Sequence, residues 1–359
     1  MSLPQAADAV RVQAGEIARF VGDVLQAVGL PAADASQVGE LIAEADLIGA
    51  DAHGIFRLPH YVRRIRASGV NVAPRITVAT TGPATALVDG DNGMGHLVVA
   101  RAAETAIALA RNAGVAWVGV RRSNHAGPAA LYAAMPVVHG MVGLYSAVAS
   151  ANHMAPWGGV EPLLGTNPIA VGIPLGDAPP VVLDIATTVV SYGTVKTHAL
   201  RGEPFPEGWL TSRVDGGPVT DPARTAEGLL NAIGGYKGSG LALVLGLLAG
   251  TLNGAAFGRD VVDFNADAAS ETNTGHFLIA LDVARFIDPA VFAREVGRHL
   301  DDLRASEALP GEGPVRMPGD MRARRRAERL EAGVPLPRPL AEQLAALAAE
   351  LSLAPPRAA

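Results

Sequence analysis

Short apolar segments, bounded by Gly, Pro or Asn, fill the middle of this 359-residue chain and limit the folds open to it. Apolar runs of this length, rich in Val and Ile, are typical of β-strands. They read ITVAT (76–80), TALVDG (85–90), AWVGV (116–120), GMVGLYSAVA (140–149), NPIAVGIP (167–174), PPVVLDIAT (179–187) and HFLIALD (276–282). We therefore predict a β-sheet formed by the middle of the chain.

Sequence with a helical repeat lies on both sides of this region. We predict helices over 7–30, 35–48 and 61–67, near 289–304, and over 321–333 and 340–351, with one more over 96–114. The fold class is thus α/β (α+β). Residues 76–299 are expected to form the sheet domain, and residues 1–75 plus 300–359 a helical domain. Strands and helices alternate only loosely, so a regular doubly wound sheet does not follow from the pattern.

Composition excludes several classes of protein. The chain has no cysteine, hence no disulfide and no thiolate site, and a net charge of −6 argues against a nucleic-acid partner. We see no signal peptide at the N-terminus. Residues 238–258 carry no charge, but Asn253-Gly254 stops the apolar run at about 14 residues, short of the roughly 20 that a membrane span needs. We expect a buried core helix there, in a soluble, cytoplasmic protein.

The segment DAHGIFRLPHY (51–61) concentrates hydrogen-bonding side chains at a helix boundary. An arginine such as Arg57 can hold a carboxylate in a bidentate pair, which lysine cannot copy. His53 can donate or accept a proton near neutral pH. Tyr61 adds a hydroxyl, whereas we expect His60 to be structural.

A second histidine follows the AWVGV strand in SNHAG (123–127). Its ordinary pKa, near 6.5, suits general acid or base catalysis. A lone histidine at this position is more often structural. The histidine and arginine of the first segment make a joint active site the better interpretation, with His125 as the proton carrier.

Three further segments offer loops that could approach a ligand: GTNP (165–168), the strand end LDIATT (183–188) and GGYKGSG (234–240). Each of them, taken alone, is also what an ordinary loop or helix cap contains. The glycines of DGDNGMGH (89–96) follow a G-x-x-G-x-G order, so they do not match the dinucleotide-binding fingerprint. The sequence has no zinc pattern, and no metal site is expected. The arginines at 322–326 are interpreted as a solvated helix face, or as a partner for a cofactor phosphate.

Taken together and in this order, these motifs make the chain resemble the malate/L-lactate dehydrogenase family, over roughly residues 10–335. The family includes ureidoglycolate, sulfolactate and diketogulonate oxidoreductases and Δ1-piperideine-2-carboxylate reductase. The resemblance implies a mostly antiparallel, seven-stranded central sheet in a non-Rossmann NAD(P)-binding domain, and a helical domain from both termini. It also implies NAD(H) or NADP(H) as cofactor and a homodimer with active sites near the subunit interface.

Residue by residue, the resemblance implies a substrate pocket at His53 and Arg57 and an acid/base role for His125, with His53 as its orienting partner. The reverse assignment of the two histidines stays open. We also expect substrate contacts from Tyr61, Thr166 and Asn167. Expected cofactor contacts come from His53, Ser150, Asp184, Ala186, Thr187, Gly235, Lys237, Met317, Pro318 and Gly319.

Three positions depart from the family pattern. Ala52 stands where the family usually has serine, Ala126 where an aromatic residue is common, and Thr194 where a lysine is usual. These differences leave the substrate open. The favoured reaction is hydride transfer between a nicotinamide and a small 2-oxo/2-hydroxy acid. The alternatives are reduction of cyclic imino acids and, from another class, a non-catalytic nucleotide-binding protein.

Overall fold

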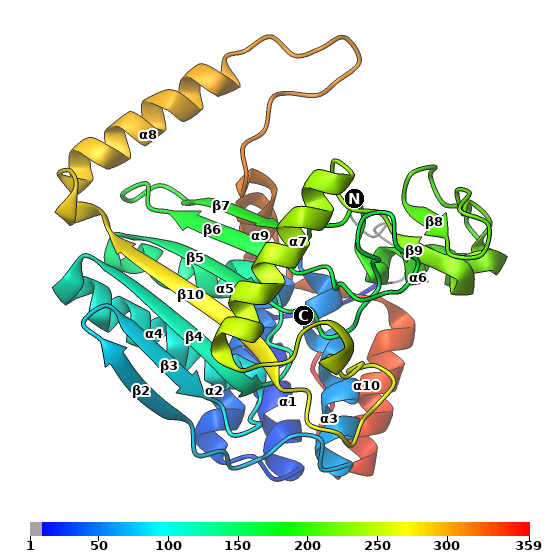
Figure 1. Cartoon of the computed structure of the whole chain (residues 1–359). Coiled ribbons are helices and arrows are strands. Elements are labelled where there is room, and N and C mark those ends of the chain that lie inside the picture. Colours follow the sequence, from blue (N-terminus) through cyan, green and yellow to red (C-terminus); the bar gives the residue numbers. More distant parts are fainter. Residues whose placement is uncertain (1–8) are drawn as a thin grey trace.

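A seven-stranded sheet in the order β2–β3–β4–β10–β5–β6–β7 forms the centre of the molecule (Figure 1). The computed structural model describes residues 9–359. The strands are β2 (Thr77–Gly82), β3 (Thr85–Asp89), β4 (Val115–Ser123), β5 (Met141–Ala147), β6 (Ile169–Ile173), β7 (Val181–Ile185) and β10 (Thr274–Asp282). Only β3 and β4 pair in parallel, and the other neighbours are antiparallel. The predicted sheet is confirmed.

Two helices cover one face of this sheet. Helix α4 (Gly95–Ala113) packs on β3, β4 and β10, and α5 (Ala129–Ala134) packs on β5 and β6. Alternate strand residues such as Val118 and Leu278 point into this layer and are buried. The approach of α5 depends on glycine: a Cβ on Gly143 or Gly172 would lie 2.2 or 2.4 Å from the carbonyl oxygen of Ala133.

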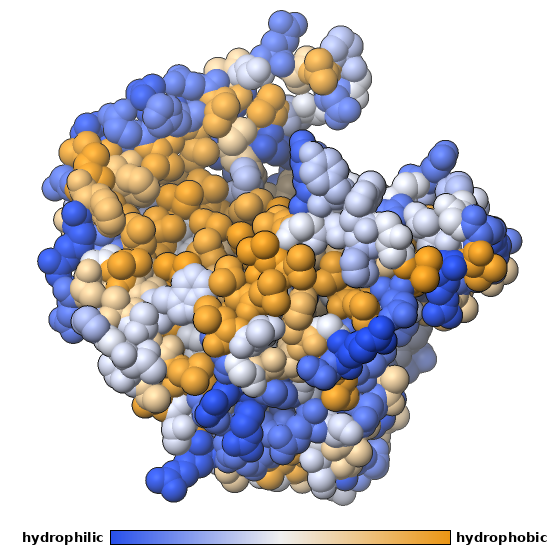
Figure 2. Space-filling model, viewed as in Figure 1, coloured by the Kyte–Doolittle hydropathy of each residue, from blue (hydrophilic) through white to orange (hydrophobic). Residues whose placement is uncertain are grey.

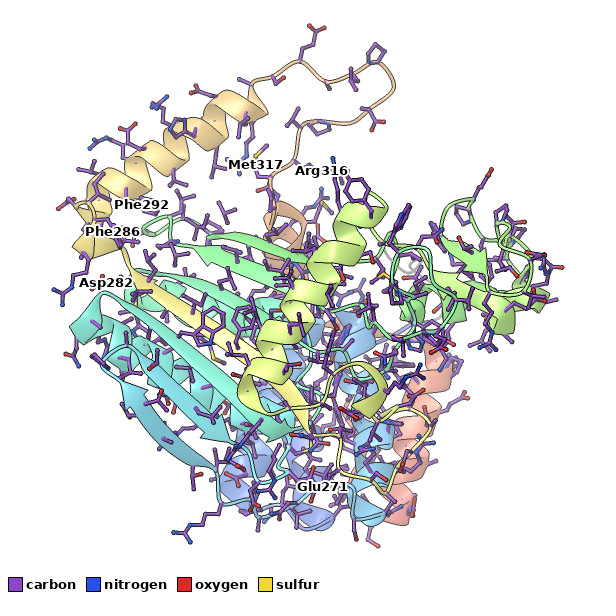
Figure 3. The ribbon with its side chains drawn as sticks, in the orientation of Figure 1. Glu271, Asp282, Phe286, Phe292, Arg316 and Met317 are labelled. Carbon is purple, nitrogen blue, oxygen red and sulfur yellow. The ribbon has the colours of Figure 1, made fainter. Side chains whose placement is uncertain are left out.

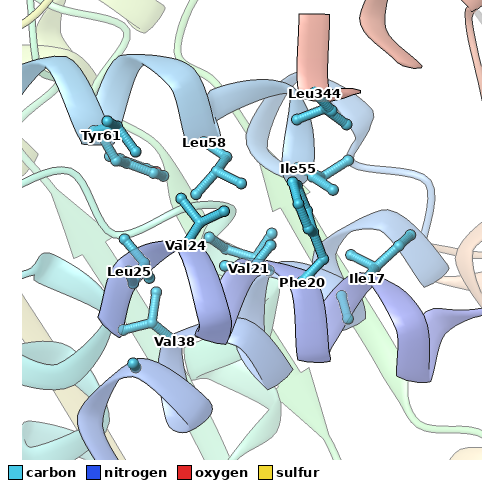
Figure 4. Packing of buried hydrophobic residues seen from close by; sticks show 14 of the residues in the cluster. Ile17, Phe20, Val21, Val24, Leu25, Val38, Ile55, Leu58, Tyr61 and Leu344 are labelled. Atoms are coloured by element: carbon cyan, nitrogen blue, oxygen red, sulfur yellow. The ribbon is translucent and has the colours of Figure 1, made fainter. Parts of the chain in front are cut away.

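The N-terminal and C-terminal helices share one hydrophobic core. They are α1 (Ala14–Ala27), α2 (Ala32–Leu47), α3 (Leu58–Arg66) and α10 (Arg338–Glu350). Helix α9 (Asp320–Ala332) lies against α2 but has no buried residue. Figure 4 shows three residues of this core: Phe20 of α1, Leu344 of α10, and Ile55, which precedes α3. The proposed domain boundaries remain a prediction.

The predicted first helix over 7–30 is too long. Residues Val10–Val12 form strand β1, which pairs with β11 (Val334–Leu336), and the helix begins only at Ala14. Pairing with a distant strand overrides the local helical pattern here. Residues 7 and 8 of that prediction lie outside the described residues.

The polar segment 201–222, rich in Gly and Pro, is part of a small folded unit. It follows α6 (Tyr192–Arg201) and contains β8 (Leu210–Ser212), which pairs with β9 (Gly228–Leu230). Phe205, Leu210 and Val219 are buried in a core of their own. The few apolar residues of this polar segment are enough to form a small core because the fold brings them together.

The helix expected to be buried, α7 (Tyr236–Ala249), is buried on one side only. Leu245 and Ala249 pack with Phe277 of β10, whereas Val244 on the other side is 51% exposed. The prediction of a fully buried helix is wrong because α7 crosses the outer surface of the sheet (Figure 1). None of the helices within residues 9–359 is long and apolar enough to cross a membrane.

Helix α8 (Pro289–Arg304) stands away from the body, and the chain returns through an extended segment (Figure 1). Figure 3 shows Phe286 and Phe292 at the start of α8 and Met317 where this segment meets the body. Short 3-10 turns complete the fold: η1 (Asp51–His53), η2 (Ile55–Arg57), η3 (Val137–His139), η4 (Pro222–Glu227), η5 (Thr251–Asn253), η6 (Gly258–Asp260) and η7 (Val283–Arg285).

Candidate active site

The segment 51–61 folds as two short turns, η1 and η2, that lead into α3. Gly54 separates the two turns, and Pro59 occupies the first turn of α3, where its missing N–H costs no hydrogen bond. This arrangement presents His53 and Arg57 on one short stretch of backbone. Tyr61 follows one helical turn after Arg57 and points into the protein, where it is 1% exposed.

The two candidate catalytic histidines lie together, as the sequence predicted. The rings of His53 and His125 are stacked, with centroids 5.5 Å apart and an angle of 9° between their planes. Burial, reinforced by the positive charge of Arg57, lowers the pKa of His53 to about 4 and lowers that of His125 well below its ordinary value. Both imidazoles are therefore neutral near pH 7.

The orientation of His125 is set by its neighbours. Its Nδ1 forms a 2.7 Å hydrogen bond with the hydroxyl of Tyr61, and the ring of Phe264 stacks on it at 5.3 Å. Its Nε2 has no hydrogen-bond partner among residues 9–359. We expected Tyr61 to contact the substrate. Its hydroxyl instead bonds to His125, whose Nε2 is left available for a substrate.

Arg57 is half-buried and only partly used by the protein. Its Nε donates to the carbonyl oxygen of Ala52 at 2.9 Å, and its Nη1 donates to Oδ1 of Asn265 at 3.2 Å. No partner within the described chain binds Nη2. The guanidinium is thus held in place with donors left over, which suits a carboxylate ligand.

A second group of predicted residues gathers at the end of β7. The carboxylate of Asp184 accepts from the backbone N–H of Ala130 at 3.1 Å and pairs with Arg322 at 3.2 Å. Burial raises the pKa of Asp184, while Arg322 opposes this shift. The charge of Arg322 also helps to lower the pKa of His53. The charge of Arg322 therefore acts both on the histidine pair and on the carboxyl group of Asp184.

Two backbone segments flank β7, one at each of its ends. Thr187 donates from both its N–H and its hydroxyl to the carbonyl oxygen of Thr166, and Ala186 lies between Asp184 and Thr187. The Met317-Pro318-Gly319 turn sits on the edge of β7, where the N–H of Val182 donates to Pro318 at 3.2 Å. Gly319 has a φ of 100°, and a Cβ there would lie 2.9 Å from the backbone nitrogen of Val182.

The remaining predicted residues are less directly connected to the histidines. Asn167 is fully buried and its amide binds the N–H of Ala149 and the carbonyl oxygen of Ala242. Ser150 accepts through its backbone carbonyl from Phe264. Gly235 and the exposed Lys237 lie at the start of α7, and no hydrogen bond within residues 9–359 joins them to His53 or His125.

Sequence analysis did not single out three residues that the fold places at the site. Phe264 and Asn265 come from a loop about 200 positions away from Arg57, with no motif to mark them. His96, in the glycine segment 89–96, is fully buried beside Tyr61, at 5.5 Å between ring centroids. Within the described residues, no group of His, Asp and Glu side chains is arranged to hold a metal ion.

Comparison with known proteins accounts for this combination of motifs. The family model described as malate/L-lactate dehydrogenase matches residues 12–345. The chain belongs to the malate/L-lactate dehydrogenase family. The expected family is confirmed, and with it the prediction that the chain is an oxidoreductase of the 2-hydroxy acid type.

Its relatives share most of the length of this dehydrogenase. Malate dehydrogenase from Pyrococcus horikoshii is 35% identical over 93% of this chain and 94% of its own. L-sulfolactate dehydrogenase from Methanothermobacter thermautotrophicus is 35% identical over 96% and 98%. The solved Δ1-piperideine-2-carboxylate reductase of Pseudomonas syringae has a TM-score of 0.82 at 30% identity, covering 94% of this chain and 99% of its own.

The names of two further relatives state their cofactor. One is the sulfolactate dehydrogenase (NADP(+)) of Chromohalobacter salexigens, 34% identical over 90% of this chain and 94% of its own. The other is the ureidoglycolate dehydrogenase (NAD(+)) of Escherichia coli O157:H7, 31% identical over 84% and 85%. The dehydrogenase thus belongs to a family that uses NAD(P), and the cofactor prediction is confirmed at this level.

Proposed function

We propose that this dehydrogenase interconverts a small 2-oxo acid and its 2-hydroxy acid, with a substrate such as malate, lactate, sulfolactate or ureidoglycolate. The observation that supports this most directly is the pair of neutral, stacked histidines beside an arginine with free donors. A 2-oxo acid carries a carboxylate next to a carbonyl. The site offers a cation for the first and a proton carrier for the second.

Each residue then has a defined task. Arg57 binds the carboxylate through Nη2 and the remaining hydrogen of Nη1. His125 moves the proton at the substrate oxygen through Nε2, while Tyr61 holds the ring from Nδ1. His53, stacked on His125, orients the substrate, and the reverse assignment of the histidines is the competing one. The nicotinamide supplies or accepts the hydride when bound.

The chemistry at the end of β7 fits a nucleotide cofactor. Arg322 places a positive charge at Asp184, and the Gly319 turn packs against the same strand near Val182. We therefore assign cofactor contacts to His53, Ser150, Asp184, Ala186, Thr187, Gly235, Lys237, Met317, Pro318 and Gly319. Thr166 and Asn167 are assigned to the substrate side, where the buried amide of Asn167 holds the loop through its bonds to Ala149 and Ala242.

Reduction of a cyclic imino acid is the second candidate, supported by the likeness to the piperideine-2-carboxylate reductase. The same arginine would bind the carboxylate, and the proton would go to nitrogen. A Cβ on Gly193 would lie 3.9 Å from the Cβ of Ala52. Gly193 directly precedes Thr194, so the backbone beside one departure from the family pattern approaches Ala52, the position of another.

Absorbance at 340 nm tests both candidates. The purified protein is mixed with NADH or NADPH and a panel of 2-oxo acids and cyclic imines, and cofactor oxidation is followed. We expect turnover with at least one 2-oxo acid. Turnover with imines alone would favour the second candidate, and no oxidation with any compound would contradict both.

We also propose that the enzyme is a cytoplasmic homodimer. Figure 2 shows hydrophobic side chains gathered on the face around α7 and α8. They include Leu243, Val244 and Leu247 of α7, which are 44%, 51% and 40% exposed. An apolar face of this kind is typical of a protein–protein interface.

Light scattering after gel filtration tests the dimer. We expect the dimer mass for the wild type and a smaller mass for Val244→Glu. Leu200→Glu is the matched control, because Leu200 is also apolar and is 89% exposed on α6. A monomeric wild type would contradict the proposal.

A further inference from the structure

The end of helix α2 carries a buried carboxylic acid directly behind the first catalytic segment. Asp46 is 2% exposed, and its Oδ2 accepts a 2.9 Å hydrogen bond from the backbone N–H of Ile55. That N–H belongs to η2, the turn that ends in Arg57. A buried acceptor of this kind costs free energy unless it has a partner, so the bond specifies where the turn lies.

The contact between the carboxyl group and the turn is close. A Cβ on Gly54 would lie 1.8 Å from Oδ1 of Asp46 and 2.3 Å from its Cγ. The φ of Gly54 is −89°, so the need for glycine comes from this contact and not from a left-handed conformation. Gly54 and Ile55 thus contact the Asp46 side chain, and both lie in the short stretch of backbone between His53 and Arg57.

A second set of bonds holds the preceding turn. Arg329 of α9 donates to the backbone carbonyl of Asp46 and to the carboxylate of Asp51, the first residue of η1. Its side chain is 13% exposed. The turn that carries His53 is therefore bound on one side to α2 and on the other to α9. Burial raises the pKa of Asp46 to about 8, in agreement with a carboxyl group that serves as a hydrogen-bond partner more than as a charge.

We propose that Asp46 is a positioning residue that sets the placement of His53 and Arg57 by holding the backbone of residues 54–57. It touches neither substrate nor cofactor. The proposal rests on the proposed function only in assigning a substrate to Arg57. A purely structural Asp46 would affect stability and leave turnover by the folded enzyme unchanged.

Two substitutions separate these roles. Asp46→Asn keeps the shape and an oxygen acceptor, so its kcat/KM should stay within about threefold of the wild type. Asp46→Ala removes the acceptor and leaves the Ile55 N–H unpaired. Because small misplacements of binding groups are costly, we expect kcat/KM to fall roughly 10- to 100-fold, with a raised KM for the oxo acid. The Kd for NADPH, measured by fluorescence without turnover, should rise by a smaller factor, because His53 is only one of the residues assigned to the cofactor.

The comparison is made at a temperature at which each variant is folded by circular dichroism. If Asp46→Ala does not fold, Asp46→Ser replaces it, since the serine hydroxyl is too short to reach the Ile55 N–H. Equal kcat/KM for the wild type and the acceptor-free variant would overturn the proposal. So would an Asn variant as impaired as the Ala variant.

Amide hydrogen exchange gives a readout that needs no substrate. Peptides covering 54–58 should exchange faster in Asp46→Ala and at the wild-type rate in Asp46→Asn. Unchanged exchange in both variants would contradict the positioning role. An inactive wild type would instead contradict the proposed function, and exchange would still test the role of Asp46.

Discussion

The hydroxyl of Tyr61 lies 2.7 Å from Nδ1 of His125, and both groups are surrounded by protein. Burial raises the pKa of Tyr61 well above its ordinary value, so the hydroxyl keeps its proton. It can donate to a bare Nδ1 or accept from a protonated one. In the proposed mechanism, the same tyrosine can therefore support His125 before and after proton transfer, and its bond to Nδ1 leaves Nε2 for the substrate.

Tyr61→Phe should lower kcat/KM by roughly 10-fold, because Nδ1 of His125 loses its partner while the aromatic ring remains. Tyr145→Phe is a matched control: Tyr145 makes a 2.7 Å bond to Nδ1 of His276 inside the sheet core. That variant should lose thermal stability and keep its turnover. Equal losses of kcat/KM in the two variants would show that Tyr61 acts only on folding.

His125→Ala should lower kcat by roughly 100- to 10,000-fold, the usual worth of a positioned acid or base. Cofactor affinity, measured by NADPH fluorescence, should change little. His53→Ala should have the smaller effect on kcat. The opposite result, a near-normal kcat for His125→Ala and an inactive His53→Ala, would assign the proton-transfer role to His53.

Arg57→Lys should mainly raise KM for the acid substrate and lower kcat/KM, because the charge remains but the planar fork is lost. The steady-state constants of the variant test this. Arg63→Lys is the control on the same helix, since Arg63 is bonded to His60 and to the backbone of Asn265. A similar rise in KM for the control would argue against a specific role of Arg57.

The stability of the protein should depend on Asp46 through pH. The folded state holds the Asp46 proton up to a pKa of about 8, whereas the ordinary value is 3.8. As pH rises from about 4 to about 8, the unfolded chain releases this proton first, so the folded state loses stability relative to it. Urea unfolding of Asp46→Asn should show a weaker decline over this range than the wild type. Parallel curves would contradict the raised pKa.

The preference between NADH and NADPH tests the arginines of α9. Three of them are paired with acidic residues elsewhere in the fold: Arg322 with Asp184, Arg326 with Glu44 and Arg329 with Asp51. Arg324 is 71% exposed and, within residues 9–359, is paired only with Glu328, so it remains a candidate for a cofactor phosphate. Arg324→Ala should lower kcat/KM for NADPH more than for NADH. An unchanged ratio would remove this residue from cofactor recognition.

The sheet and its flanking helices could be predicted because their signals are local. Alternating apolar residues between Gly and Pro mark the strands, and the helical stripe of 96–114 becomes α4. The histidines and Arg57 could also be named in advance, since their motifs are short and specific to one family. Local signals failed at Val10–Val12, which is a strand only because β11 lies beside it.

The environment of each site residue depends on which distant segments come into contact, and local sequence patterns do not predict those contacts. Asn265 reaches Arg57, and Phe264 stacks on His125, across separations of more than a hundred positions. Asp46 reads as an ordinary acidic residue near a helix end, but the fold buries it against Gly54. The residue types of the site were thus determined by sequence, whereas packing between remote segments decided the environment, and hence the pKa and hydrogen bonds, of each side chain.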